Sequence, residues 1–135
     1  MIEMKESTFV VPQKAIIRDG DKYLILKRAP DAHTYPNHWD FPGGRLNAGE
    51  DTKKGLEREV FEETELKVNA IKPVFTFHES LNNRLQFFVV YLCKKISGQI
   101  KLSHEHTEYK WATRDEILKL KIENYLRAYL RAVRE

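Results

Sequence analysis

The chain has 135 residues, of which 41% are hydrophobic and 32% charged, and its formal net charge is +3. This length suits one compact domain, residues 1–135, and the composition excludes a disordered chain or a membrane span. The small positive charge favours a polyanionic ligand but does not by itself indicate a nucleic-acid-binding protein, so nucleic acid is not the expected partner. Residues 1–8 lack the apolar core of a signal peptide, and the single cysteine, Cys93, has no partner for an internal disulfide. We therefore expect a soluble, cytoplasmic protein, as a monomer or homodimer.

The N-terminal part of the chain predicts a hairpin followed by a loop. Residues 8–28 contain two runs of apolar and β-branched residues that meet at Asp19-Gly20, a dipeptide suited to a tight turn. Prolines and polar residues interrupt any period between residues 29 and 38, which predicts a surface loop. Loops of this length often carry function.

The remainder of the chain predicts strands between two helices, which is an α/β arrangement. Asp51 is a candidate N-cap for the first helix. A near-continuous apolar run after it predicts a strand buried on both faces. The predicted elements are a helix over 52–63, a bent strand or strand pair over 67–80, a buried strand over 85–96, a short strand and a second strand within 100–113, and a final helix over 116–133, capped by Thr113 or Asp115.

The first helix carries an unusual group of carboxylates. Successive helical residues turn by about 100 degrees, so Glu59, Glu62 and Glu63 fall within one sector roughly 100 degrees wide. Glu59 and Glu63 repel each other at i,i+4, and anions near a helix C-terminus oppose the macrodipole. A bound cation would reverse both effects, and clustered carboxylate oxygens suit Mg²⁺ or Mn²⁺. The spacing alone favours a solvated acidic face on which Arg58 pairs with Glu62.

The context of these carboxylates distinguishes the two interpretations. Gly44 is followed by five residues, Glu50, seven residues and then "REVFEETEL", which ends at Leu66. Residues 44–66 therefore resemble the Nudix box, the signature of the Nudix or MutT-like hydrolases. The pattern matches at Gly44, Glu50, Arg58, Glu59, Val60, Glu62, Glu63 and Leu66, and departs from it at Glu65, where the box has glycine.

The resemblance implies a fold and a metal site. The fold is an α/β/α sandwich with a mixed central sheet, the box helix on one face and the C-terminal helix on the other. The family hydrolyses nucleoside diphosphates linked to another group, with divalent metal. Carried onto this chain, Glu59 and Glu63 are metal ligands, and Glu62 is a further ligand or the residue that orients or deprotonates water. The Gly43 carbonyl is an additional ligand, which would explain the missing side chain at that position.

The remaining box positions have supporting roles by the same resemblance. Gly44 belongs to the structural motif, and Arg58 and Glu50 hold the loop and the helix in register for catalysis. Glycine at position 65 would end the helix in left-handed geometry, so Glu65 predicts altered loop geometry or a helix that continues for another turn.

Later segments supply candidate residues for catalysis and substrate binding. By family resemblance, the loop before the last strand offers Glu105, or else Glu108, as a further metal-binding residue or base, and its histidines, His104 and His106, could contact phosphate or a base. The candidates for contacting phosphate or stacking on a nucleotide base are Arg28, Tyr35, Trp39 and Phe77.

We therefore expect a nucleoside triphosphate pyrophosphohydrolase that releases monophosphate and pyrophosphate. The loop near Glu105 also resembles that of diadenosine tetraphosphate hydrolases, but the tyrosine associated with that activity is absent at residues 82–84. The proline associated with ADP-ribose pyrophosphatases is absent near Leu81. These two activities, nucleotide-sugar cleavage, and a nucleotide- or RNA-binding module on an inactive scaffold are the alternatives.

Overall fold

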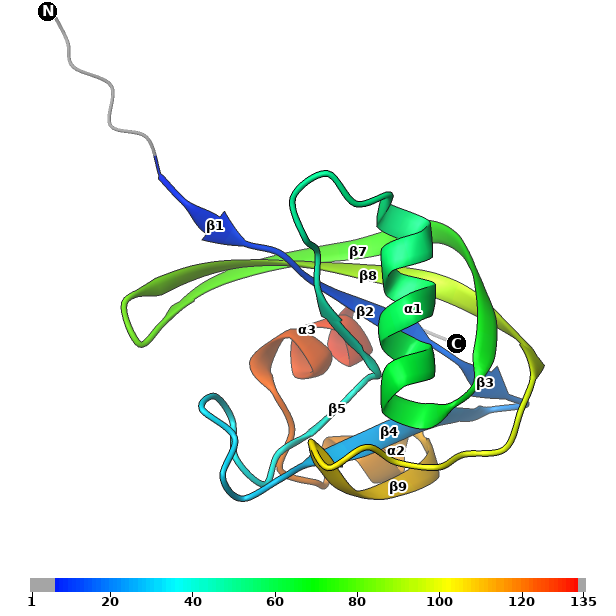
Figure 1. Cartoon of the computed structure of the whole chain (residues 1–135). Coiled ribbons are helices and arrows are strands. Elements are labelled where there is room, and N and C mark those ends of the chain that lie inside the picture. The colour runs from blue at the N-terminus through cyan, green and yellow to red at the C-terminus, as the bar shows by residue number, and fades with distance from the viewer. Residues whose placement is uncertain (1–6, 134–135) are drawn as a thin grey trace, which may run out of the picture.

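The computed structural model describes residues 7–133; residues 1–6, within the segment that lacks signal-peptide features, lie outside that range. Two β-sheets and three helices make up this part of the chain (Figure 1). In chain order the elements are β1 (Phe9–Val10), β2 (Pro12–Ile16), β3 (Arg18–Asp19), β4 (Lys22–Arg28), β5 (Trp39–Asp40), β6 (Gly43–Arg45), α1 (Thr52–Thr64), β7 (Lys67–Leu81), β8 (Arg84–Ser97), β9 (His106–Thr113), α2 (Arg114–Leu118) and α3 (Asn124–Ala132).

The larger sheet is mixed and the smaller one is antiparallel. In the larger sheet, β8 pairs in parallel with β1 and β2 and antiparallel with β7, and β2 also pairs antiparallel with β6. In the smaller sheet, β4 pairs antiparallel with β3, β5 and β9. The mixed sheet was predicted, and the arrangement is confirmed.

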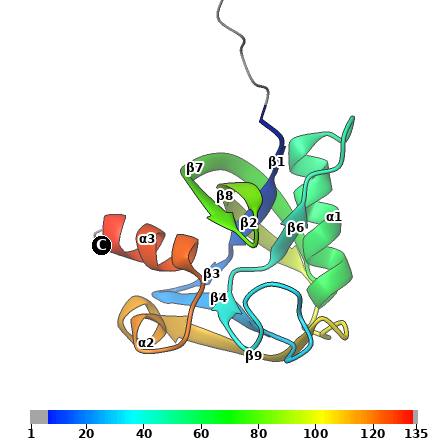
Figure 2. The ribbon, with the colours of Figure 1, turned by 90° about the vertical axis from the view of Figure 1, so that its left-hand side faces the viewer.

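Apolar residues on the two faces of these strands form two cores. Ile16 and Ile25 face one core, whereas their neighbours Ala15 and Leu24 face the other, as expected from the alternation of side chains along a strand. α3 covers the first core and α1 covers the second (Figure 2). The structure therefore confirms the predicted α/β/α sandwich, with the two helices on opposite faces.

The predicted hairpin over residues 8–28 is only partly correct. The turn at Asp19-Gly20 is present, with Gly20 at φ 62°, but only β3 pairs with the start of β4. β2 instead joins the larger sheet, where Gln13–Ile16 pair with Val89–Leu92. Local sequence predicted the turn, but the parallel partner lies far along the chain.

Helix α1 begins and ends as short-range signals dictate. The Asp51 side chain accepts a hydrogen bond from the Lys54 N–H, which confirms the predicted N-cap. The helix ends at Thr64, and Glu65 adopts the left-handed conformation at φ 60°, with its N–H donating to the Phe61 carbonyl. The alternative that the helix continues past Glu65 is therefore wrong.

The C-terminal half differs from prediction in two places. Residues 100–102 form no strand, and the predicted single helix over 116–133 is divided into α2 and α3. Thr113 caps α2 through a reciprocal capping box with Glu116, as one of the two predicted caps. The chain leaves helical geometry between the two helices because Ile122 forms a bridge with Trp39 of β5.

Strands β7 and β8 follow the predictions more closely. β7 is one bent strand whose register against β8 shifts three times. The centre of β8 is buried, including Phe88, Val90 and Cys93, but Phe87 is exposed and so are the last residues of the strand. Among the described residues, no helix has the length and apolar character needed to cross a membrane.

Candidate active site

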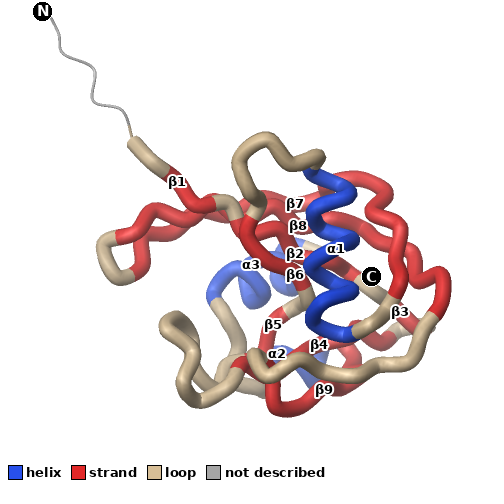
Figure 3. The backbone as a smooth tube through the Cα atoms, in the orientation of Figure 1, coloured by secondary structure: helices blue, strands red, loops and turns tan. Residues whose placement is uncertain are grey.

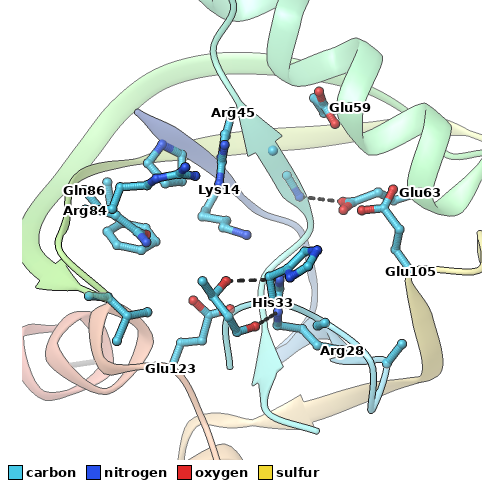
Figure 4. Close-up of a pocket in the computed structure, with 18 of the residues that line it drawn as sticks. Lys14, Arg28, His33, Arg45, Glu59, Glu63, Arg84, Gln86, Glu105 and Glu123 are labelled. Carbon is cyan, nitrogen blue, oxygen red and sulfur yellow. Dashed lines mark hydrogen bonds between the residues drawn. The ribbon is translucent and has the colours of Figure 1, made fainter. Parts of the chain in front are cut away.

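A polar pocket of about 1110 Å³ opens between α1, β2, β6 and the β7–β8 hairpin. The loop between β4 and β5 and the segment before α3 complete its walls. Figure 4 shows Glu59, Glu63 and Glu105 on one side of the pocket and Lys14, Arg45 and Arg84 on the other. The lining residues that matter below are Lys14, Arg28, Thr34, Gly43, Gly44, Arg45, Glu59, Glu62, Glu63, Leu81, Arg84, His104, Glu105 and Glu123.

The Arg58 guanidinium organises the carboxylates of α1. Its Nε donates to Glu50 at 2.9 Å, its Nη1 donates to Glu62 at 3.1 Å, and its Nη2 donates to Glu59 at 3.2 Å. Glu50 lies in the loop before the helix, so the Arg58–Glu50 pair links loop and helix as predicted. The same guanidinium partly offsets the repulsion between the helix carboxylates.

Glu63 differs from its neighbours because it is buried. Its carboxylate accepts a hydrogen bond from the Gly43 N–H at 2.7 Å. Burial raises the pKa of Glu63 to about 7, against the lowering effect of His106 and Lys14. Burial also raises the pKa of Glu59, to a smaller extent. Without further positive charge nearby, ionising both Glu59 and Glu63 on this side of the pocket therefore costs free energy.

Gly43, just before the box, is required for steric reasons, and Gly44, which opens the box, leaves room for a neighbouring side chain. Gly43 has φ 145°, and a Cβ there would overlap the backbone carbonyl of Gln13 on the neighbouring strand. The missing side chain at Gly43 was predicted to make room for a metal ion, but in the structure it makes room for the backbone of β2. A Cβ on Gly44 would overlap the carboxylate of Glu59, so Gly44 leaves room for that side chain.

A buried ionic group forms the floor of the pocket, and the sequence analysis did not find it. The Lys14 Nζ lies 3.0 Å from Asp40 Oδ2, and the Arg28 Nη1 lies 3.7 Å from the same oxygen. Burial alone would raise the pKa of Asp40, but Lys14 lowers it well below its usual range. Arg28, a predicted phosphate contact, lines the pocket and also donates from Nε to the Thr34 carbonyl at 2.9 Å.

The loop before β9 contributes differently from each of its polar residues. His104 and Glu105 line the pocket, and the Glu105 carboxylate forms no hydrogen bond or ion pair within residues 7–133. His106 is buried between Asp40, at 3.8 Å, and Glu63, at 3.9 Å. Glu108 pairs with Lys27 at 3.4 Å outside the pocket lining, so Glu105 is better placed of the two candidates.

Glu123 is a further pocket residue that sequence reasoning missed. It lies just before α3, is 4% exposed, and its Oε2 has no hydrogen-bond partner within the described chain. Burial and the negative charge of Asp40 raise the pKa of Glu123 well above its usual value. No local pattern marks Glu123, because the predicted helix ran through it; the signal is a buried carboxyl in the folded pocket wall whose Oε2 has no hydrogen-bond partner within residues 7–133.

The structure does not bring the three predicted aromatic residues into the pocket lining. Trp39 is buried, with the Lys110 ammonium over its ring. Phe77 packs against the core that α3 covers, with its ring 6.4 Å from Phe88. The Tyr35 hydroxyl donates to Glu79 at 2.8 Å. Their role in stacking on a base stays a prediction that this arrangement does not support.

The donor chemistry of the carboxylate wall fits a hard divalent cation. Glu59, Glu62, Glu63 and Glu105 present only oxygen donors to one pocket. Within residues 7–133, no three His, Cys, Asp or Glu side chains converge tightly enough to form a preassembled metal site. Arg58 engages one oxygen of Glu59 and one of Glu62, which leaves the second oxygen of each carboxylate for a cation.

Comparisons with known proteins agree with this geometry. The NUDIX domain family model matches residues 11–133. A nucleoside triphosphatase NudI from Enterobacter sp. (strain 638) is 28% identical over 126 residues, covering 84% of this chain and 86% of that protein. A crystal structure of a MutT protein from Methanosarcina mazei Go1 superposes with a TM-score of 0.86 at 28% identity, covering 96% of this chain and 95% of the other. A MutT NUDIX hydrolase from Burkholderia pseudomallei has the same fold, with a TM-score of 0.84 at 21% identity over 95% of this chain and all of the other.

Proposed function

Because this chain belongs to the NUDIX domain family and is a Nudix pyrophosphohydrolase, we propose that its substrates are nucleoside triphosphates, cleaved to monophosphate and pyrophosphate with Mg²⁺ or Mn²⁺. The observation that carries this proposal is one pocket with carboxylates on one wall and cationic side chains on the other. A metal-bound triphosphate requires both kinds of wall. The relatives named nucleoside triphosphatase support the choice of substrate.

In this proposal the box residues hold the metal. Glu59, Glu62, Glu63 and the Gly43 carbonyl are its ligands, and the bound cation would neutralise phosphate charge and acidify water. Arg58 keeps the carboxylates on one side of α1 through its bonds to Glu59 and Glu62.

The other pocket residues act on the substrate and on the attacking water. Glu105 faces the pocket without a partner in the described chain, so we assign it to water deprotonation. Lys14, Arg28 and Arg84 lie where they could pair with phosphate oxygens. Burial and the negative charge of Asp40 raise the pKa of Glu123, so in its protonated form this side chain would offer an O–H donor to a substrate oxygen.

The test is a panel assay with matched variants. We expect pyrophosphate release from canonical or oxidised nucleoside triphosphates in Mg²⁺ or Mn²⁺, and no release in chelator. Glu62→Gln and Glu63→Gln should each lower turnover by more than the roughly 10- to 100-fold that loss of a supporting residue costs. Glu65→Gln is the control, because that exposed side chain lies outside the pocket lining.

The same panel includes the substrates of the alternative activities. Cleavage confined to diadenosine tetraphosphate, ADP-ribose or nucleotide sugars would reject the triphosphate assignment. Nucleotide binding without any turnover would point to an inactive scaffold.

A further inference from the structure

We propose that Tyr35, Glu79 and Asn124 form a clasp that positions the wall of the pocket and thereby controls substrate affinity. The Tyr35 hydroxyl donates to the two carboxylate oxygens of Glu79, at 2.8 and 3.0 Å. The Asn124 Nδ2 donates to Glu79 Oε2 at 3.1 Å. Glu79, on β7, thus accepts hydrogen bonds from the β4–β5 loop and from the first turn of α3. This inference rests on the proposed function, because it concerns the same pocket.

None of the three clasp residues lines the pocket, but each lies within two positions of a residue that does. Thr34 precedes Tyr35 in the loop, Glu123 precedes Asn124, and Leu81 is two positions beyond Glu79 on β7. The β4–β5 loop, the end of β7 and the start of α3 gather at one end of the molecule (Figure 3). The clasp therefore joins three separate parts of the pocket wall through residues that do not themselves line the pocket.

The loop that the clasp holds has a conformation that its own sequence does not favour. Tyr35 has φ 50° and Asn37 has φ 61°, both in the left-handed region, where a bulky residue such as tyrosine is rarely found. Strained backbone of this kind persists only where surrounding contacts fix it. The contacts that fix it include backbone hydrogen bonds from the His38 N–H to the Tyr35 carbonyl and from the Asn37 N–H to the Arg28 carbonyl. Side chains add the Arg28 bond to the Thr34 carbonyl, the packing of Tyr35 on the His38 ring at 5.0 Å, and the clasp.

The Tyr35–Glu79 bond is the clasp contact expected to matter most. A hydroxyl that donates to a carboxylate forms a charge-assisted bond, which is stronger than a bond between neutral groups. Tyr35 and Glu79 are both half-buried, so water competes for them less than at an open surface. Without this bond, the Thr34 side of the loop is held by Arg28, while the Tyr35 side retains its ring contact with His38 and the backbone hydrogen bond from the His38 N–H to the Tyr35 carbonyl.

The experiment separates positioning from a general structural role. The variants are Tyr35→Phe, which removes only the hydroxyl, Glu79→Ala, which removes the acceptor, and Glu79→Gln, which keeps one acceptor oxygen. Tyr109→Phe is the matched control, because Tyr109 is 46% exposed on β9 and lies outside the pocket lining. Amide hydrogen exchange of residues 29–38 is measured on the protein without substrate, and KM and kcat are measured with triphosphate and Mg²⁺.

We expect Tyr35→Phe and Glu79→Ala to speed exchange across the loop and to raise KM by roughly 10- to 100-fold, the scale of one lost charge-assisted bond. kcat should stay within about twofold, because no clasp residue touches the reacting groups. Glu79→Gln should recover part of both effects, because it keeps an acceptor oxygen but loses the charge, and Tyr109→Phe should change neither.

Unchanged loop exchange in folded Tyr35→Phe and Glu79→Ala would overturn the clasp, and so would a fall in kcat at constant KM. Failure of the proposed function is recognised separately, since the wild-type protein would then release no pyrophosphate from triphosphates. In that event loop exchange decides alone: acceleration in both variants, with recovery in Glu79→Gln, supports the clasp, and its absence rejects it.

Discussion

At the scale of single residues, burial and the nearest charge set the protonation of the pocket acids. Glu63 and Glu123 are buried, and burial raises the pKa of each above its usual value. Asp40 is equally buried, but Lys14 at 3.0 Å keeps its pKa below the usual range. Neighbouring carboxyl groups can therefore have different charges at the same pH, with Asp40 ionised and Glu123 neutral.

This difference predicts that the free energy of unfolding depends on pH, and that Glu123→Gln makes this dependence weaker. Because the pKa of Glu123 is higher in the folded state, the unfolded chain ionises it first as the pH rises above about 4.5. Its stabilising contribution is present below that pH and is lost as the pH rises through the folded pKa. One such group contributes a slope of up to about 1.4 kcal/mol per pH unit.

The measurement is urea unfolding of metal-free protein at pH 5, 6.5 and 8. We expect the unfolding free energy of the wild type to fall more steeply with pH than that of Glu123→Gln. Glu65→Gln, at an exposed position, should follow the wild type. Parallel slopes for wild type and Glu123→Gln would mean that Glu123 is already ionised in the folded protein.

At the scale of elements, the ends of helices matter more for the pocket than their middles. α1 ends where its carboxylates face the pocket, and the break between α2 and α3 places Glu123 in the wall. A continuous C-terminal helix would have carried Glu123 in regular helical geometry instead. The sequence pattern predicted the end of α1 within one residue but missed the break between α2 and α3, which is the interruption that brings Glu123 into the site.

The end of α1 yields a prediction about stability. Glu65→Gly should stabilise the protein by roughly 0.5–1 kcal/mol, because glycine adopts φ 60° without the ~1–2 kcal/mol penalty of a Cβ and loses only part of this gain through unfolded-state entropy. Thermal unfolding measures the effect. Glu65→Ala is the control because it keeps the Cβ. Equal melting temperatures for the two variants would contradict left-handed strain at this position.

At the scale of the whole molecule, the pocket assembles from segments distant in sequence. Lys14, Asp40, Glu63, His106 and Glu123 lie within one buried ionic group, although they come from both sheets, α1 and the segment before α3. A ligand that binds this group stabilises the fold that assembles it.

Mg²⁺ held by Glu59, Glu62 and Glu63 should likewise raise the melting temperature of the wild-type protein, because it binds the folded state in preference to the unfolded chain. A ligand at 100 times its Kd contributes about 2.7 kcal/mol, which corresponds to several degrees for a chain of this size. Thermal unfolding in Mg²⁺ and in chelator measures the shift. Glu63→Gln should show a much smaller shift, and no shift in the wild type at saturating metal would count against the carboxylate wall as a metal site.

The sequence by itself determined the family resemblance, the helix from its Asp51 cap, and the carboxylates on one side of that helix. These features depend on residues close together in the chain, where capping, helical periodicity and fixed motif spacing act. The family resemblance also indicated Gly43, next to the motif, and Glu105, in the polar loop. Arg28 was a candidate on the second predicted strand, and all three residues line the pocket.

Only the tertiary structure decided which distant residues meet. It joined β2 to β8, paired Lys14 with Asp40, divided the C-terminal helix so that Glu123 enters the pocket, and placed Tyr35 on Glu79. Strand pairing and buried ion pairs between distant residues leave no periodic trace in the local sequence, because their free energy arises only when the chain is folded.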